Sequence, residues 1–249
     1  KNVSSICIIG CGSAYHVGVV ASYVIEDLAG IPVRLEFASE FRYRRPVLPK
    51  GTLCVIISQS GETADSLAAL RMAKEQGYRT LAIVNVVGSS IAREADHVLY
   101  THAGPEIAVA TTKAYSAQLI VCYALAIRLA SVKGAIDQDE EKRLVSEIRS
   151  IPDKIEKILE DDRRIQWFAS KFANAQDMFV IGRGIDYAIG MEASLKMKEV
   201  SYIHSEAYAA GELKHGTISL LEEGTLVIGI MTQPGIYEKT LSNMVECKS

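Results

Sequence analysis

The two halves of this chain repeat one pattern of strand, turn and helix, and this repeat constrains the fold more than any other feature. The segment from Val180 to Tyr187 repeats the form of Ile8 to Tyr15: a strand, a G-x-G turn and a tyrosine three residues later. Further on, G-T-L, an apolar strand and T-Q-P-G at 224–235 echo G-T-L, a strand and S-Q-S-G at 51–61. The first echo is displaced by 172 positions, and T-Q-P-G is displaced from S-Q-S-G by 174. We therefore predict a tandem duplication of one α/β unit.

Short apolar runs alternate with helical patterns through the first half, which predicts a parallel sheet with helices on both faces. The expected strands are Ser5–Ile9, Val33–Phe37, Leu53–Ile57, Thr80–Asn85 and His97–Thr101. We predict a first domain over 1–134, a helical linker over 135–162 that is broken near Pro152, and a second domain over 163–249. In the register of the second echo, Ser249 stands opposite Glu75. The second copy is therefore expected to be incomplete, and the native polypeptide to extend beyond both Lys1 and Ser249.

Composition excludes several classes of protein. The chain has 249 residues, 49% of them hydrophobic, and a net charge of -3 without a basic stripe, so nucleic acid is not an expected partner. Its five cysteines are scattered and form no C-x-x-C pair, as in reduced cytoplasmic proteins. The longest apolar stretch, Leu119 to Ala130, is interrupted by Arg128, so no membrane span is predicted.

The run Ser58–Thr63 follows a buried strand and precedes a helix expected over Glu62–Gln76. Its hydroxyls and the backbone N–H groups of the helix start predict an anion site, and the absence of lysine and arginine favours a sugar monophosphate over a nucleoside triphosphate. An ordinary capped helix, with Ser60 as the N-cap, is the alternative. Ser13 adds a hydroxyl after a neighbouring strand. Pro234 stands at the position of Ser60 in the second copy, so the site is expected only in the first.

In the second half, Glu192, Lys196 and Glu199 fall on one face of a predicted helix. They form either a solvated salt bridge or a general base, Glu199, beside a cation. His215 follows a polar run and is either an acid–base group or a helix C-cap contact. The G-x-G turns lack the third glycine of a dinucleotide site, where Tyr15 and Tyr187 stand, so no such cofactor is expected. The histidines lack metal-ligand spacing, and no metal is predicted.

Several motifs together resemble the isomerase half of the glutamine–fructose-6-phosphate aminotransferases, also called glucosamine-6-phosphate synthases. They are S-Q-S-G-E-T at 58–63, C-G-S at 11–13, A-S-E-F-R-Y at 38–43, L-K-M-K-E at 195–199 and A-Y-A-A-G-E-L-K-H-G at 207–216. The first motif alone indicates a sugar isomerase (SIS) domain, whereas the last is much more specific to the synthase. The motifs cover almost the whole chain.

This resemblance implies two SIS domains in a homodimer, each a flavodoxin-like three-layer α/β/α sandwich, with the second truncated here. The sugar phosphate would be fructose 6-phosphate or glucosamine 6-phosphate. The resemblance further implies that the 6-phosphate is held by Ser13, Ser58, Gln59, Ser60 and Thr63. Glu199 would move a proton between C1 and C2 with Lys196 close by, His215 would assist ring opening in the other subunit's site, and the backbone at Val109 would line the sugar pocket.

The sequence also departs from the family pattern. Ala14 replaces the usual hydroxyl after Ser13, and the glutaminase domain and the C-terminal lysine tail are absent from this chain. We therefore expect the chain alone to lack the overall glutamine-dependent activity. Two alternatives stay open: a stand-alone SIS isomerase or deaminase, and a phosphosugar sensor without turnover.

Overall fold

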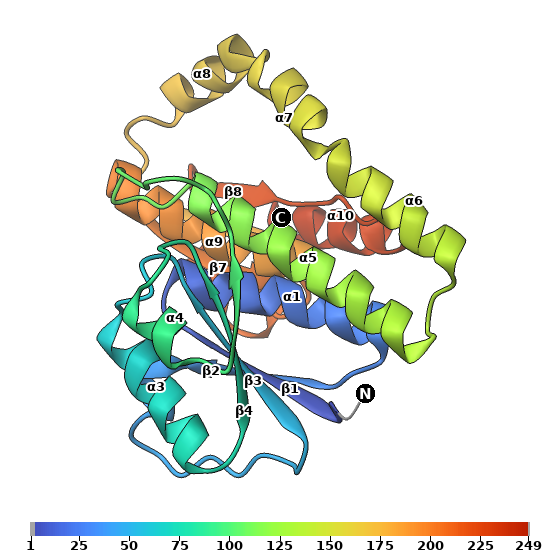
Figure 1. The fold of residues 1–249 in the computed structure, drawn as a ribbon. Helices are drawn as coiled ribbons and strands as arrows, with labels where there is room; N and C mark the ends of the chain where they lie inside the picture. Colours follow the sequence, from blue (N-terminus) through green and yellow to red (C-terminus); the bar gives the residue numbers. More distant parts are fainter. Residues whose placement is uncertain (1–2, 249) are drawn as a thin grey trace. The chain divides into compact units, whose positions relative to one another are not determined.

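The computed structural model describes residues 3–248. The chain forms two compact units, one ending at Ile148 and the other beginning at Arg149. Each unit is built on its own parallel sheet, as the alternation of strands and helices predicts (Figure 1).

The first unit contains a five-stranded sheet in the order β2-β1-β3-β4-β5, with every neighbouring pair parallel. Its strands are β1 (Ser5–Gly10), β2 (Val33–Phe37), β3 (Thr52–Ser58), β4 (Arg79–Val84) and β5 (His97–Tyr100). Its helices are α1 (Ser13–Ala29), α2 (Ala38–Phe41), α3 (Ala64–Glu75), α4 (Ser90–Glu94), α5 (Lys113–Lys133) and α6 (Gln138–Arg149). This strand order is that of flavodoxin-like folds, as the resemblance implies.

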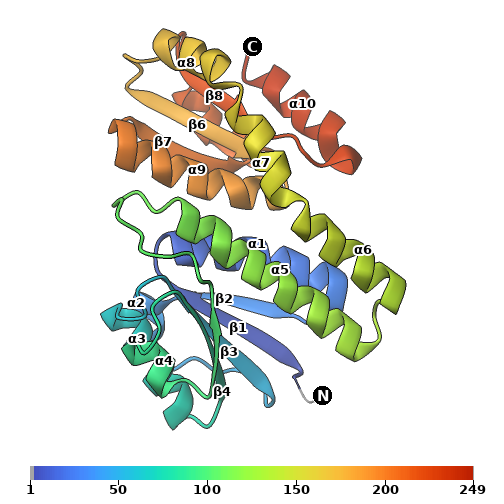
Figure 2. The ribbon, with the colours of Figure 1, turned by 45° about the horizontal axis from the view of Figure 1, so that its top comes forward.

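The two faces of β1 belong to two different cores, because side chains alternate along a strand. Ile6 and Ile8 pack in a cluster with α1 and α5. Cys7 and Ile9 pack in a second cluster with α2, α3 and α4 on the opposite face. The sheet is thus buried on both sides between two helical layers (Figure 2).

Helix α5 is the one helix within residues 3–248 that is long and apolar enough, by length and composition, to cross a membrane. Core helices of globular proteins share these properties. Its residues Cys122, Ala126 and Ala130 lie in the core cluster with α1, and the ammonium of Lys133 donates to the carbonyl of Ala29 over 2.8 Å.

The second unit has a parallel sheet in the order β7-β6-β8. Its elements are α7 (Ile151–Leu159), α8 (Asp162–Lys171), β6 (Asp177–Gly182), α9 (Ile185–Ser201), β7 (His204–Ala209), the 3-10 turns η1 (Leu213–His215) and η2 (Thr217–Leu220), β8 (Leu226–Gly229), η3 (Pro234–Ile236) and α10 (Tyr237–Glu246). The order repeats β2-β1-β3 of the first unit, and the fold is therefore a tandem α/β duplication. Glycines Gly12 and Gly184, which precede α1 and α9, even share their dihedral angles, with φ of 54° and 56°.

Strand pairing corrects the predicted register of the second echo. Ile6 pairs with Leu53 in the first sheet, and Met178 pairs with Leu226 in the second. Continued along β8, this register places Met231 opposite Ser58, whereas the sequence echo placed Thr232 there. The strand pairing fixes the offset between the two copies along β8. The T-Q-P-G echo requires an offset that is one residue larger.

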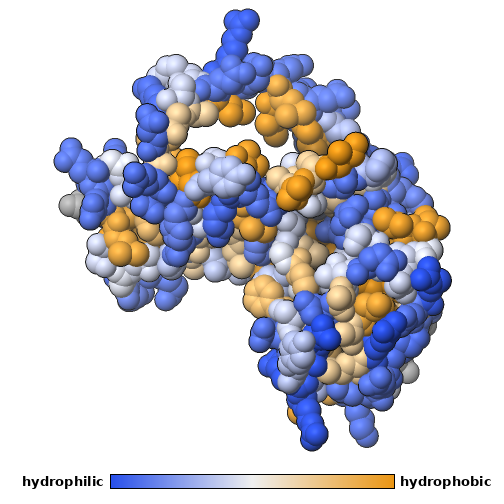
Figure 3. Space-filling view, turned by 90° about the vertical axis from the view of Figure 1, so that its left-hand side faces the viewer, coloured by the Kyte–Doolittle hydropathy of each residue, from blue (hydrophilic) through white to orange (hydrophobic). Residues whose placement is uncertain are grey.

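Helices α6 and α7 run through the predicted linker, and Pro152 stands in the first turn of α7, where the missing N–H of proline costs nothing. The predicted domain boundaries, at 134/135 and 162/163, stay a prediction. On α7 and α8 several large apolar side chains are exposed, among them Ile158, Leu159 and Trp167. Figure 3 shows this apolar surface on the segment at the top of the view.

Candidate functional site

The turn Ser58–Thr63 connects β3 to α3, and Ser13 begins α1 directly after β1. Since β1 and β3 are paired parallel neighbours, both turns lie at the same carboxyl edge of the sheet. Between these two strands the order of the sheet reverses direction, and ligands of open α/β sheets bind at such a switch point. The topology thus brings together the two hydroxyl-bearing turns that the sequence singled out.

Hydrogen bonds inside the turn fix its shape. The Ser58 hydroxyl, on a residue only 3% exposed, accepts the N–H of Gly61 over 3.1 Å and lies 3.2 Å from the Thr63 hydroxyl. The Ser60 hydroxyl accepts the N–H of Glu62 over 3.2 Å. The hydroxyls of Ser58, Ser60 and Thr63 therefore belong to one compact loop at the start of α3.

The capped-helix alternative is wrong in its details. Thr63, not Ser60, occupies the N-cap position of α3, and within the described chain its side chain makes no capping bond to the helix. The carboxylate of Glu62 points to another turn and accepts the N–H of Ser90 over 2.7 Å. The hydrogen bonds from Ser90 hold the pKa of Glu62 below its ordinary value. The first turn of α3 is thus left without a side-chain cap, as an anion site requires.

A glycine is required at position 61. Its φ is +67°, and a Cβ at this position would lie 2.0 Å from the Ser89 hydroxyl oxygen. The carbonyl of Gly61 also accepts the N–H of Ile91 over 3.0 Å. The turn therefore packs closely against the loop that follows β4. A larger residue at position 61 would clash with this loop and displace it.

In the second unit, the three charged residues of α9 are close together. They do not form the solvated surface salt bridge that was the alternative. Glu192 is 5% exposed, and its carboxylate lies 3.4 Å from the ammonium of Lys196. The same ammonium contacts the carboxylate of Glu199, whose side chain is 30% exposed. Lys196 thus bridges a buried and an accessible carboxylate, and the accessible one is the predicted base.

The polar run at 205–216 contains a strand that sequence reasoning missed. Residues His204–Ala209 form β7 beside β6, and Ser205 is fully buried although polar. Its carbonyl accepts the hydroxyl of Ser194 over 2.8 Å, which fastens the strand to α9. The strand is hard to predict because its residues are small or polar and lack the apolar run that is typical of a parallel strand.

His215 ends the short turn η1, and its side chain is exposed. Val109 lies in the loop between β5 and α5 and is 93% exposed, and its carbonyl accepts the N–H of Thr111 over 2.9 Å. The roles predicted for His215, Val109, Glu199 and Lys196, and for the phosphate-binding residues, stay predictions.

The corrected register no longer places Pro234 at the position of Ser60, but the carboxylate of Asp186 distinguishes this edge of the second sheet from the first. Asp186, at the start of α9, is 2% exposed, and its carboxylate accepts the backbone N–H of Thr232 over 2.9 Å as well as the Thr232 hydroxyl. The chain's own carboxylate thus occupies the donors at this edge of the second sheet.

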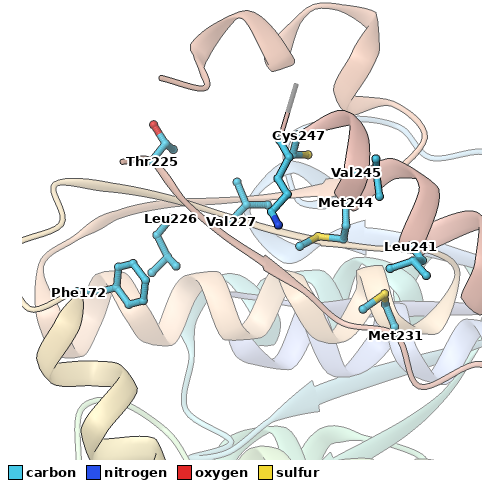
Figure 4. Close-up of a pocket in the computed structure, with 10 residues that line it drawn as sticks. Phe172, Thr225, Leu226, Val227, Met231, Leu241, Met244, Val245 and Cys247 are labelled. Atoms are coloured by element: carbon cyan, nitrogen blue, oxygen red, sulfur yellow. The ribbon is translucent and has the colours of Figure 1, made fainter. Parts of the chain in front are cut away.

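A pocket of about 430 Å³ between β8 and α10 is lined mainly by apolar side chains such as Leu226, Met231 and Met244, unlike a phosphate site (Figure 4).

No group of three or more histidine, cysteine, aspartate or glutamate side chains placed to hold a metal ion occurs within residues 3–248. Neither unit therefore offers an obvious metal site among the residues described.

Comparison with known proteins agrees with this architecture. The SIS domain family matches residues 1–128 and 171–249. The chain is 58% identical over 246 residues to the glutamine--fructose-6-phosphate aminotransferase [isomerizing] of Clostridium tetani and 56% identical over 249 residues to that of Caldanaerobacter subterraneus. It spans 40% and 41% of the lengths of these two relatives.

Two solved structures resemble the fold over nearly the whole chain. The C-terminal domain of glucosamine-fructose-6-phosphate aminotransferase from Francisella tularensis is 39% identical, with a TM-score of 0.97, and 69% of it is covered. A glucosamine-6-phosphate deaminase from Thermotoga maritima is 25% identical, with a TM-score of 0.83, and 74% of it is covered. The chain therefore belongs to the SIS domain family, in the branch formed by the isomerase part of the glutamine–fructose-6-phosphate aminotransferases.

Proposed function

We propose that this chain is the phosphosugar-binding isomerase part of a glutamine–fructose-6-phosphate aminotransferase. It binds fructose 6-phosphate, and within the full-length enzyme it converts this ketose, with ammonia derived from glutamine, to glucosamine 6-phosphate. The observation that carries this proposal is the loop Ser58–Thr63, with its three hydroxyls at the switch point of the first sheet.

The 6-phosphate binds at this loop and serves to place the sugar. The hydroxyl O–H groups, the side-chain amide of Gln59 and the uncapped N–H groups of α3 together donate to a doubly charged phosphate, and the helix dipole adds to the attraction. The residues in this role are Ser13, Ser58, Gln59, Ser60 and Thr63. Binding energy from this remote group fixes the reacting carbons relative to the catalytic side chains.

Isomerisation requires one group that removes a proton from one carbon and returns it to its neighbour. Glu199 is the proposed carrier between C1 and C2, since its carboxylate is accessible and contacts the ammonium of Lys196. Lys196 also offers a positive charge to the oxygen on which negative charge develops. His215 assists opening of the sugar ring in the site of the other subunit, and the backbone at Val109 lines the sugar.

The partners follow from the same assignment. A glutaminase domain of the same polypeptide supplies ammonia, the protein acts as a homodimer, and it works in the cytoplasm without a cofactor. The length of the curated relatives, of which this chain spans about 40%, leaves room for such a domain.

A stand-alone SIS isomerase or deaminase is the second candidate, and the similarity to the deaminase from Thermotoga maritima favours it. A sensor that binds without turnover is disfavoured by Glu199, which a binding module does not need.

Titration calorimetry of the chain with fructose 6-phosphate, fructose and inorganic phosphate tests the binding. We expect fructose 6-phosphate to bind most tightly and fructose to give no heat, because the phosphate supplies most of the affinity. Absence of heat with fructose 6-phosphate from folded protein would contradict the proposal for this chain.

Turnover is tested in the full-length enzyme. A Glu199→Gln variant should still bind fructose 6-phosphate but lose at least about 100-fold in kcat, the range for removal of a general base. A variant with normal turnover would overturn the proposed role of Glu199. A gene without a glutaminase segment would instead favour the stand-alone isomerase.

A further inference from the structure

Asn85 follows β4 directly and lies at the same edge of the sheet as the phosphate-binding loop. Its backbone N–H donates to the carbonyl of Gln59 over 3.0 Å. The main chain of Asn85 therefore holds one side of the loop Ser58–Thr63 in place, whatever its side chain does.

The side chain of Asn85 points to the segment that follows β5. Its amide nitrogen donates to the carbonyl of Gly104 over 2.7 Å. Its amide oxygen accepts the hydroxyl of Thr101 over 3.0 Å and the N–H of Ala103 over 2.9 Å. These bonds use both the donor and the acceptor of the amide, which an aspartate or an aliphatic residue cannot reproduce.

The segment held in this way is irregular and depends on these bonds. His102 has a φ of 51° and Gly104 a φ of 69°, so the chain makes two left-handed steps here. At the far end, the carboxylate of Glu106 accepts the N–H of Ala114 at the start of α5 over 3.1 Å. Val109, between Glu106 and α5, is 93% exposed and makes little packing contact of its own.

We propose that Asn85 is a positioning residue, which fixes the loop 101–112 relative to the phosphate-binding loop. One side of Asn85 holds the loop for the phosphate, and the other holds the segment that lines the sugar. This inference rests on the proposed function, because it assigns the two loops to the two ends of one phosphosugar.

The other end of β4 offers a matched control. There the Asp96 carboxylate accepts two hydrogen bonds from Thr80, one from the backbone N–H over 2.8 Å and one from the hydroxyl over 2.9 Å. This side-chain bond also joins the β4 and β5 region, but at the amino edge of the sheet, away from both loops. Loss of the Thr80 hydroxyl should therefore lower stability without touching the site.

The experiment is titration calorimetry of wild type, Asn85→Ala, Asn85→Asp and Thr80→Val with fructose 6-phosphate and with inorganic phosphate. Asn85→Ala should weaken fructose 6-phosphate about 10-fold and change the affinity for inorganic phosphate less than about 2-fold, since the backbone bond to Gln59 remains. Asn85→Asp keeps the acceptor and should fall between wild type and Asn85→Ala. Thr80→Val should match wild type for both ligands.

Two results would overturn the inference. The first is that Asn85→Ala binds both ligands as wild type does. The second is that it loses affinity for both equally, which would mean general damage to the phosphate loop. A wild-type chain without preference for fructose 6-phosphate over inorganic phosphate would instead refute the proposed function, and so the two failures are distinguishable.

Discussion

The carboxylate of Asp186 accepts both the backbone N–H and the hydroxyl of Thr232, at the edge of the second sheet that corresponds to the turn Ser58–Thr63 of the first copy. Removing this buried carboxylate leaves two donors without partners. Asp186→Ala should therefore lower the free energy of unfolding by about 2–4 kcal/mol. Urea denaturation measures this loss. The control is Asp177→Ala at the exposed start of β6, expected within about 0.5 kcal/mol of wild type. Equal stabilities for the two variants would refute the role given to Asp186.

Gly61 is expected to be far less tolerant of alanine than another glycine with a similar backbone. At Gly61, with φ of +67°, a Cβ meets the Ser89 hydroxyl oxygen at 2.0 Å, whereas at Gly77, with φ of +78°, a Cβ meets no atom within 4 Å. Gly77→Ala should cost about 1 kcal/mol from backbone strain alone. Gly61→Ala should cost about 1–3 kcal/mol more and weaken phosphosugar binding. Thermal unfolding compares the two, and Ser89→Gly should recover part of the Gly61→Ala loss. A Gly61→Ala protein as stable as Gly77→Ala would contradict the close approach.

Ser60 should contribute to ligand affinity rather than to stability. Its hydroxyl is half-buried and makes one bond within the turn, to the N–H of Glu62. A hydrogen bond to a charged phosphate contributes about 1.5–3 kcal/mol, so Ser60→Ala should weaken fructose 6-phosphate binding about 10-fold or more. Calorimetry measures this change. Ser170→Ala, on exposed α8, removes a hydroxyl that donates to the carbonyl of Trp167 and should leave the affinity unchanged. An unchanged affinity of Ser60→Ala would remove Ser60 from the site.

Most of the first unit could be predicted from sequence, because buried parallel strands are apolar on both faces. The runs at 53–57 and 5–9, for example, fall within β3 and β1. The paired strands also confirm that the turns at Ser13 and Ser58 follow neighbouring strands. Local patterns sufficed here because each element buries its own apolar residues.

The features that could not be predicted from the sequence depend on tertiary contacts. Strand β7 was hidden because its polar Ser205 is buried by packing on α9, and the role of Asp186 required knowledge that Thr232 lies beside it. The predicted register of the second echo was one residue out, since only strand pairing fixes such an offset. Asn85 carried no signal either, because a single asparagine after a strand is also an ordinary turn residue.

The thiols should differ sharply in reactivity. Cys7 and Cys54 are fully buried and paired across β1 and β3, and the hydrogen bond to Cys54, followed by burial, raises the pKa of Cys7 far above its ordinary value. Burial raises the pKa of Cys122 to about 12. Because the thiolate is the reactive form, these thiols should resist alkylation in native protein at pH 8. Half-exposed Cys11 should react first, and all five thiols should react after denaturation. Mass spectrometry identifies the sites, and modification of Cys7 as fast as Cys11 would contradict the burial.

The central claim is that the loop Ser58–Thr63 of the first unit holds the phosphate of a phosphosugar. A crystal structure of the chain with fructose 6-phosphate tests it most directly. We expect the phosphate oxygens within about 3.2 Å of the Ser58, Ser60 and Thr63 hydroxyls and of the first-turn N–H groups of α3. The same region of the second unit should be empty, because Asp186 holds its donors. Phosphate bound beside Asp186, or anywhere other than the loop Ser58–Thr63, would contradict the account.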